Sequence, residues 1–155
     1  MKKLSALFLS IVLLLTLCAC GKKDGDSTSS VASDSTAFVK PTSYSAVLSM
    51  KIYPQFKIYL DSGNYVLALE ALNKDATTVK QSMKASVADI KSVTKSILTA
   101  AKKEGFLKEN IEIDLEITEL NNTELNEADI LKEAATAVES AASGLGITVS
   151  VNTHK

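Results

Sequence analysis

The sequence contains no arginine, one histidine and two cysteines, and both cysteines lie within the first 20 residues. After Cys20 the chain can therefore form neither a disulfide nor a thiolate metal site. The one histidine, His154, lies next to the last residue, where we expect a solvent-exposed side chain. A metal site or a catalytic triad needs several converging partners, and no GxSxG motif of a hydrolase is present. The sequence thus predicts no metal, no cofactor and no classical hydrolase activity.

The charge balance excludes a further class of function. The net charge is −1 at pH 7, and every basic side chain other than the histidine is a lysine. Loss of the lysines at the N-terminus would make the chain more acidic still. Proteins that bind nucleic acids carry clusters of basic side chains and a high isoelectric point. We therefore expect no nucleic-acid partner.

The N-terminal residues 1–19 have the pattern of a secretory signal. Two lysines precede an apolar run at residues 4–17, which is shorter than the about 20 residues of a membrane-spanning helix. The sequence Leu17-Cys18-Ala19-Cys20 that follows resembles the lipobox of bacterial lipoproteins. This resemblance implies that the thiol of Cys20 receives diacylglycerol, that cleavage precedes Cys20, and that the chain is held on the extracytoplasmic face of the cell membrane. The alternative is an ordinary signal peptide with incidental cysteines.

The composition divides the remaining chain into a tether and a domain. Residues 20–42, which begin with the lipidated cysteine, are rich in Ser, Thr, Asp, Lys and Gly and have few apolar side chains. Such a segment buries too little surface to offset the entropy of ordering, so it is predicted to be a flexible tether. Residues 43–153 then form one domain of ordinary size.

Within the domain, the spacing of apolar residues predicts both strands and helices. Alternation with a period of two predicts five strands, near residues 44–52, 56–61, 65–72, 111–118 and 147–152. The first three follow one another through turn residues, which favours an antiparallel meander. Tyr53-Pro54, between the first two, is interpreted as a turn.

Two helical stripes complete the pattern. The first includes Val87, Ile90, Ile97, Leu98 and Ala101, begins at a capping box formed by Ser86 and Asp89, and ends near Gly105. The second runs from Leu125 to Ala142 and is closed by Gly144, and residues 75–84 leave room for one short helical turn. The predicted fold is α+β, in the order βββ-α-β-α-β. Its five-stranded mixed sheet carries two long amphipathic helices on one face.

Several short motifs resemble the extracytoplasmic middle domain of the anti-sigma factor RsgI. They are the proline at the end of the first strand, Pro54; the sequence Ala71-Leu72-Asn73 after the third strand; and Gly105-Phe106-Leu107 after the first long helix. The resemblance covers residues 43–120 by motif and the rest by order of elements. It implies the fold given above and a module that interacts with a partner of the cell envelope.

Two departures from RsgI limit what the resemblance implies. RsgI-type proteins carry a cytoplasmic sigma-binding domain and a membrane helix before this domain, whereas here we expect only a removable signal, so the chain is not expected to hold a sigma factor itself. In the family the first strand ends in Asn-Pro, and the asparagine amide attacks its own carbonyl to cut the chain. Tyr53 has no amide, so Tyr53 and Pro54 are interpreted as a vestigial cleavage position without catalytic residues.

Two charged rows are candidate binding surfaces. Glu112, Asp114 and Glu116 alternate along the fourth predicted strand, and this row fits a hard cation or a basic partner, or else a solvated sheet face. A second row, Lys91, Lys95 and Lys102, shares one side of the first long helix. It fits an anionic surface, or else an ordinary solvated helix face.

Three hypotheses of function follow. The first is a non-enzymatic, lipid-anchored interaction or sensory module, bound to the membrane by its diacylglycerol and to an unknown envelope protein. The second is a self-processing domain that cuts at Tyr53-Pro54. The third is an envelope protein that binds an ion or a small ligand.

Overall fold

A computed structural model describes residues 38–154, which form five strands and three helices. The predicted signal, Cys20 and nearly all of the tether lie outside these residues. The elements, in chain order, are β1 (Ala46–Lys51), β2 (Gln55–Leu60), β3 (Val66–Ala71), α1 (Lys74–Ser82), α2 (Ile90–Lys103), β4 (Ile111–Leu120), α3 (Glu127–Leu145) and β5 (Val149–His154). In the region from 38 to 154, no helix has both the length and the apolar character needed to cross a membrane.

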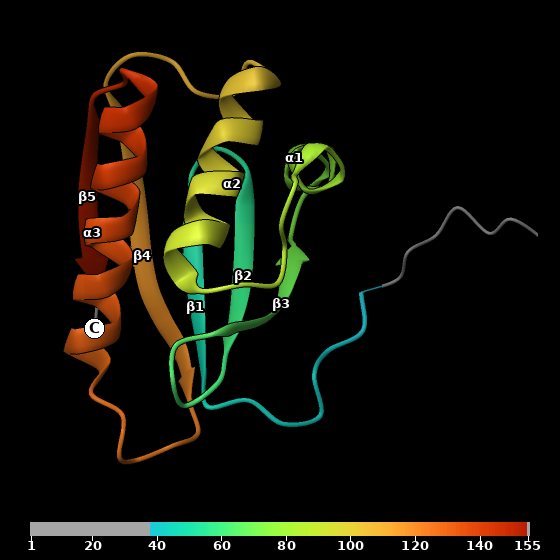
Figure 1. Cartoon of the computed structure of the whole chain (residues 1–155), viewed down its shortest axis with the longest axis vertical. Helices are drawn as coiled ribbons and strands as arrows, with labels where there is room; N and C mark the ends of the chain where they lie inside the picture. The colour runs from blue at the N-terminus through green and yellow to red at the C-terminus, as the bar shows by residue number, and fades with distance from the viewer. Residues whose placement is uncertain (1–37, 155) are drawn as a thin grey trace, which may run out of the picture. The chain divides into compact units, whose positions relative to one another are not determined.

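The strands form one mixed sheet in the order β3-β2-β1-β4-β5. Neighbours are antiparallel except β4 and β5, which are parallel and joined through α3. The α+β class, the mixed five-stranded sheet and the three-stranded meander are confirmed. β1 lies at the centre, between β2 and β4, so each side of its backbone is paired (Figure 1).

The helices cover one face of the sheet. Figure 1 shows α2 in front of the central strands and α3 in front of β4 and β5. The short α1 lies beside the edge strand β3, where Lys80 Nζ donates to the carbonyl of Leu69 at 2.6 Å. The two predicted long helices are thus present, and the residues left open for a helical turn form α1.

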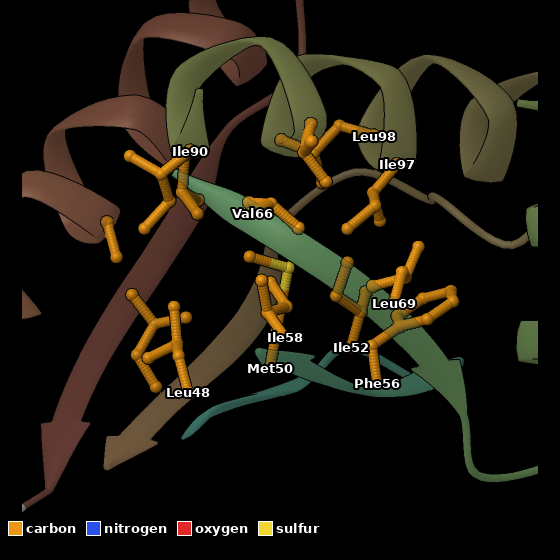
Figure 2. Packing of buried hydrophobic residues seen from close by; sticks show 14 of the residues in the cluster. Leu48, Met50, Ile52, Phe56, Ile58, Val66, Leu69, Ile90, Ile97 and Leu98 are labelled. Atoms are coloured by element: carbon orange, nitrogen blue, oxygen red, sulfur yellow. The ribbon is translucent and has the colours of Figure 1, made fainter. Parts of the chain in front are cut away.

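The core lies between the sheet and the helices, and Figure 2 shows its part beneath α2. The sheet contributes Leu48, Met50 and Ile58, and α2 contributes Ile97 and Leu98, each with an exposure of 0%. Burial of one such side chain is worth about 1.5–3 kcal/mol. The opposite face carries no helix among the described elements, and we call it the helix-free face.

The start of α2 differs from the prediction. Asp89 is the N-cap and accepts a hydrogen bond from the backbone N–H of Ser92 at 2.9 Å, so the helix begins at Ile90 and the capping box predicted at Ser86 is wrong. Val87 precedes the helix and is 53% exposed, so it does not belong to the buried stripe. The physical reason lies in β3, because the Val66 N–H donates to the carbonyl of Ala88 at 2.8 Å and holds the chain extended there.

The ends of α3 and β5 also differ from the prediction. α3 begins after the N-cap Asn126, so Leu125 precedes it. It ends at Gly146, which adopts a left-handed conformation with φ of 66° that glycine tolerates without strain. Gly144 lies inside the last turn and does not close the helix. The sheet extends to His154, beyond the predicted last strand.

Candidate functional site

The Tyr53–Pro54 bond lies in the three-residue connection between β1 and β2. Lys51 and Gln55 face each other as the last pair of the hairpin, and the Ile52 N–H donates to the carbonyl of Pro54 at 3.2 Å. Pro54 is buried, whereas the side chain of Tyr53 is 74% exposed. The predicted turn is confirmed, and the backbone hydrogen bond between Ile52 and Pro54 closes it.

Asn73 joins this turn to the first helix. Its Nδ2 donates to the carbonyl oxygen of Tyr53 at 3.1 Å, while its Oδ1 accepts from the N–H of Ala76 at 2.8 Å as the N-cap of α1. The arrangement depends on the sheet register, because the Leu72 N–H donates to the carbonyl of Gln55 at 2.9 Å and brings the end of β3 beside the turn. One side chain thus contacts both the carbonyl of Tyr53 and the start of α1.

This geometry defines what the Tyr53–Pro54 bond can do chemically. The Asn73 amide is a hydrogen-bond donor aimed at the carbonyl oxygen, and such donors stabilise negative charge that develops on a carbonyl under attack. An attacking group is the other requirement. The phenol of Tyr53 is exposed to solvent. The tyrosine side chain contains no amide nitrogen that could attack the carbonyl of its own residue. The site therefore has a donor for the carbonyl, but Tyr53 itself brings no amide nucleophile.

The acidic row of β4 lies on the helix-free face, opposite the core residues Ile113 and Leu115. Asp114 accepts a hydrogen bond from Asn152 Nδ2 at 3.0 Å, and His154 Nε2 lies 3.5 Å from its Oδ1. The hydrogen bond from Asn152 is the main cause that lowers the pKa of Asp114, and His154 adds to it. His154 is thus placed in the last strand beside a carboxylate, although half of its side chain remains exposed.

The other two members of the row differ from each other. Glu116 accepts from Lys51 Nζ at 2.9 Å, which lowers the pKa of Glu116 and raises that of Lys51. Glu112 makes no side-chain hydrogen bond or ion pair with the described residues. Between residues 38 and 154, no three His, Cys, Asp or Glu side chains gather closely enough to hold a metal ion. Polar and basic side chains thus contact two of the three acidic residues of the row. Cation binding stays a prediction.

The predicted lysine row lies along the boundary between α2 and α3. Lys91 and Lys95 border a shallow groove of about 170 Å³ whose floor on α3 includes Ala137 and Ala141. Lys102 Nζ donates to the carbonyl of Leu145, one of the last carbonyls of α3, where a cation also complements the helix dipole. Lys91 and Lys95 make no ion pair with residues 38–154, whereas Lys102 is engaged with the end of α3.

A cluster on the helix-free face was not predicted from the sequence. Tyr59 is 2% exposed, and the rings of Phe38 and Tyr44 lie 5.4 and 5.2 Å from its ring. Lys40 lies 4.8 Å from the centre of the Tyr44 ring and 3.4 Å from Glu119 Oε2, which also accepts a hydrogen bond from the Tyr44 hydroxyl. The sequence feature that could have indicated this cluster is an aromatic residue, Tyr59, at a position where the alternation of the strand predicts a polar side chain.

The described domain matches a known protein family. Residues 45–155 match the family described as "Anti-sigma factor RsgI-like central domain". The chain belongs to this family. The comparison with curated proteins found no match.

Membership in the RsgI-like central-domain family confirms the resemblance suggested by the motifs. It extends the resemblance beyond residue 120, because the match includes α3 and β5. The asparagine of the Ala71-Leu72-Asn73 motif has a clear structural role in this RsgI-like domain, as the link between α1 and the Tyr53 carbonyl. The sequence pattern located Asn73, but its contact across to Tyr53 required the register of β2 and β3.

Proposed function

We propose that this RsgI-like central domain is a non-enzymatic interaction or sensory module, carried on the extracytoplasmic face of the cell membrane by a lipid on Cys20. Family membership supports a module of the anti-sigma-factor type. The sequence Leu17-Cys18-Ala19-Cys20 supports the anchor, and the composition of residues 21–41 supports a flexible connection to the domain. A partner in the envelope then binds the folded domain.

The geometry at Tyr53 is the main support for a domain that does not cleave itself. Its carbonyl accepts a hydrogen bond from Asn73, while its own side chain is exposed and contains no amide that reaches this carbonyl. Cleavage at an Asn-Pro bond needs such an amide, so the Tyr53–Pro54 bond is expected to persist. A domain that keeps this bond retains an unbroken β1–β2 hairpin.

Intact mass spectrometry tests the proposal. The chain from residue 20, with Cys20→Ser to remove the lipid, is purified and incubated at 37 °C for several days. We expect a single mass for the whole chain. Two fragments that meet between Tyr53 and Pro54 would contradict the non-enzymatic role.

Metabolic labelling tests the anchor in the full chain. We expect a labelled fatty acid to be incorporated into the wild-type chain and into Cys18→Ser, because Cys18 leaves with the signal. Cys20→Ser should incorporate none. The two cysteines lie two residues apart, so the pair of variants separates the anchor from general effects on export. Equal labelling of both variants would contradict a lipid on Cys20.

A second candidate function is self-processing at Tyr53-Pro54. The specific observation in its favour is the Asn73 donor, which lies 3.1 Å from the oxygen that would become negatively charged during cleavage. This candidate predicts two fragments in the mass experiment above. It also predicts that Asn73→Ala would abolish their formation, because that variant removes the donor.

A further inference from the structure

A surface hollow of about 480 Å³ lies between the C-terminal end of α1, the linker of residues 83–89 and α2. It adjoins the groove between α2 and α3, because Lys95 lines both. Its size falls within the range of small-molecule sites in proteins. Neither the acidic row of β4 nor the Tyr53–Pro54 turn contributes to it.

The charged side chains around this hollow are all basic. Lys84 from the linker and Lys95 and Lys103 from α2 line it, and no Asp or Glu of the described residues does so. Within residues 38–154, Lys84 and Lys95 make no ion pair, and Lys103 has only a long contact of 3.7 Å with Glu104. By contrast, the neighbouring hollow beside Lys91 includes Asp129 and Glu133. The charge around the first hollow is thus unbalanced and favours an anion.

Hydroxyl groups form most of the remaining polar lining. Ser92, Ser96 and Thr99 lie on the same stripe of α2 as Lys95 and Lys103. Ser82 lines the hollow from the end of α1, where its hydroxyl donates to carbonyls of its own helix and keeps its lone pairs as acceptors. A hydroxyl can donate one hydrogen bond and accept others, so it suits the hydroxyl groups of a sugar or polyol. Lysines and hydroxyls converge here on one concave surface.

The linker is fixed across this hollow. The backbone N–H of Ala85 donates to Ser96 Oγ at 3.2 Å, which ties residue 85 to the middle of α2. Ala85 and the buried Ala100 also line the hollow, and their small side chains leave room for a ligand. The hydrogen bond between Ala85 and Ser96 thus joins the linker to α2 at the edge of the hollow.

We propose that this hollow binds a small polyhydroxylated anion, meaning a sugar or polyol that carries a phosphate or carboxylate group. The lysines would neutralise the anion, and the serine and threonine hydroxyls would bind the polyol. The apolar stems of Lys84 and Lys95 would cover its carbon skeleton. This inference does not depend on the lipid anchor or on the chemistry at Tyr53.

Titration followed by NMR tests the proposal, with the ¹⁵N-labelled chain from residue 20 carrying Cys20→Ser. The probe is glucose 6-phosphate, and glucose and inorganic phosphate are the comparison ligands. We expect saturable shifts of the amides of residues 82–85 and 92–99 with glucose 6-phosphate, and weaker binding of both comparison ligands. Equal binding of inorganic phosphate would overturn the proposed role of the hydroxyls.

A pair of double variants locates the site. Lys84→Gln with Lys95→Gln should weaken the binding of glucose 6-phosphate by roughly tenfold for each charge-assisted hydrogen bond that is lost. Lys74→Gln with Lys108→Gln removes the same charge from exposed positions that do not line the hollow, and should leave the affinity unchanged. The proposal is overturned if both double variants lose affinity equally, or if no probe gives saturable shifts.

Vesicles distinguish a soluble ligand from a lipid headgroup. We expect the unlipidated chain to bind vesicles of phosphatidylglycerol no more tightly than it binds vesicles of phosphatidylcholine. Tight binding to phosphatidylglycerol vesicles, lost in the Lys84→Gln and Lys95→Gln variant and without saturable shifts in glucose 6-phosphate, would overturn the proposed ligand and assign the surface to the membrane.

Discussion

The ring of Phe38 stacks on the ring of Tyr59, with 5.4 Å between their centres and 26° between their planes. Tyr59 faces away from the helices, whereas its neighbours in β2, Ile58 and Leu60, belong to the core beneath them. Burial and a hydrogen bond from the Tyr59 hydroxyl to Glu70 raise the pKa of Tyr59 to about 12. The segment that precedes β1 thus binds the helix-free face and shields an aromatic side chain of the sheet.

The first prediction concerns this segment. We expect Phe38→Ala to lower the free energy of unfolding by about 1 kcal/mol, because a stacked aromatic pair contributes about 0.5–1.5 kcal/mol beyond the area that it buries. Because the chain has no tryptophan, urea unfolding followed by far-UV circular dichroism is the suitable measurement.

The neighbouring Val39 provides the control. Its side chain is 82% exposed, so Val39→Ala should change the free energy of unfolding by no more than about 0.5 kcal/mol. Equal unfolding midpoints for Phe38→Ala and Val39→Ala would mean that the segment does not bind the sheet in solution.

The second prediction separates the two roles of Asn73. Asn73→Ala loses both the cap of α1 and the contact with Tyr53, and should cost about 1–2 kcal/mol of stability. Asn73→Asp keeps an oxygen that accepts from Ala76 and loses only the donor to the Tyr53 carbonyl, so it should cost less. The same urea experiment measures both variants. A larger loss for Asn73→Asp than for Asn73→Ala would show that the cap is not the main contribution.

The third prediction is the dependence of stability on pH. The pKa of Asp114 is lowered in the folded chain, chiefly by Asn152, so the unfolded chain takes up a proton first as the pH falls. The stabilisation is therefore complete above the ordinary pKa of aspartate, about 3.9, and is lost as the pH falls through the lower folded value. We expect the Tm of Asp114→Asn to fall less than that of the wild type between about pH 6 and pH 3. The effect is small, because this side chain is 40% exposed and solvent screens the interaction.

Glu112→Gln is the matched control for this measurement. Glu112 lies on the same face of β4 and makes no side-chain contact of this kind with the described residues. Its Tm should follow that of the wild type over the whole pH range. If Asp114→Asn and Glu112→Gln gave the same profile, the hydrogen bond from Asn152 would have no role in the acid dependence.

The sequence predicted those features that depend on local periodicity. In β4, Ile111 and Ile113 alternate with acidic side chains. This alternation does not depend on the neighbouring strands, so β4 could be predicted from spacing alone. The position of β4 beside β1 could not be predicted in this way, because strand pairing depends on contacts between residues far apart in sequence. The predicted start of α2 was wrong for the same reason. Ser86 and Asp89 both fit a cap by residue type, and the hydrogen bond between Val66 and Ala88 decides between them.

The fourth prediction restores the chemistry that Tyr53 lacks. Tyr53→Asn places an amide next to the carbonyl that Asn73 already contacts, at an exposed position that accepts a polar side chain. The new amide nitrogen bonds to the carbonyl carbon of residue 53, the bond to Pro54 breaks, and the amide proton passes to the proline nitrogen. We expect two fragments in intact mass spectrometry after incubation at 37 °C. They should co-migrate under native conditions, because β1 is paired with both β2 and β4.

Two further variants connect this cleavage to its cause. Tyr53→Leu has nearly the shape of the asparagine side chain without its nitrogen, so it should stay intact. Tyr53→Asn combined with Asn73→Ala should cleave more slowly, by roughly 10²-fold if the Asn73 donor acts like one donor of an oxyanion hole. An intact Tyr53→Asn chain would contradict the prediction, because it would mean that the β1–β2 turn does not hold the amide and the carbonyl in an orientation suited to attack. Cleavage that is equally fast without Asn73 would leave this residue with a purely structural role at the start of α1.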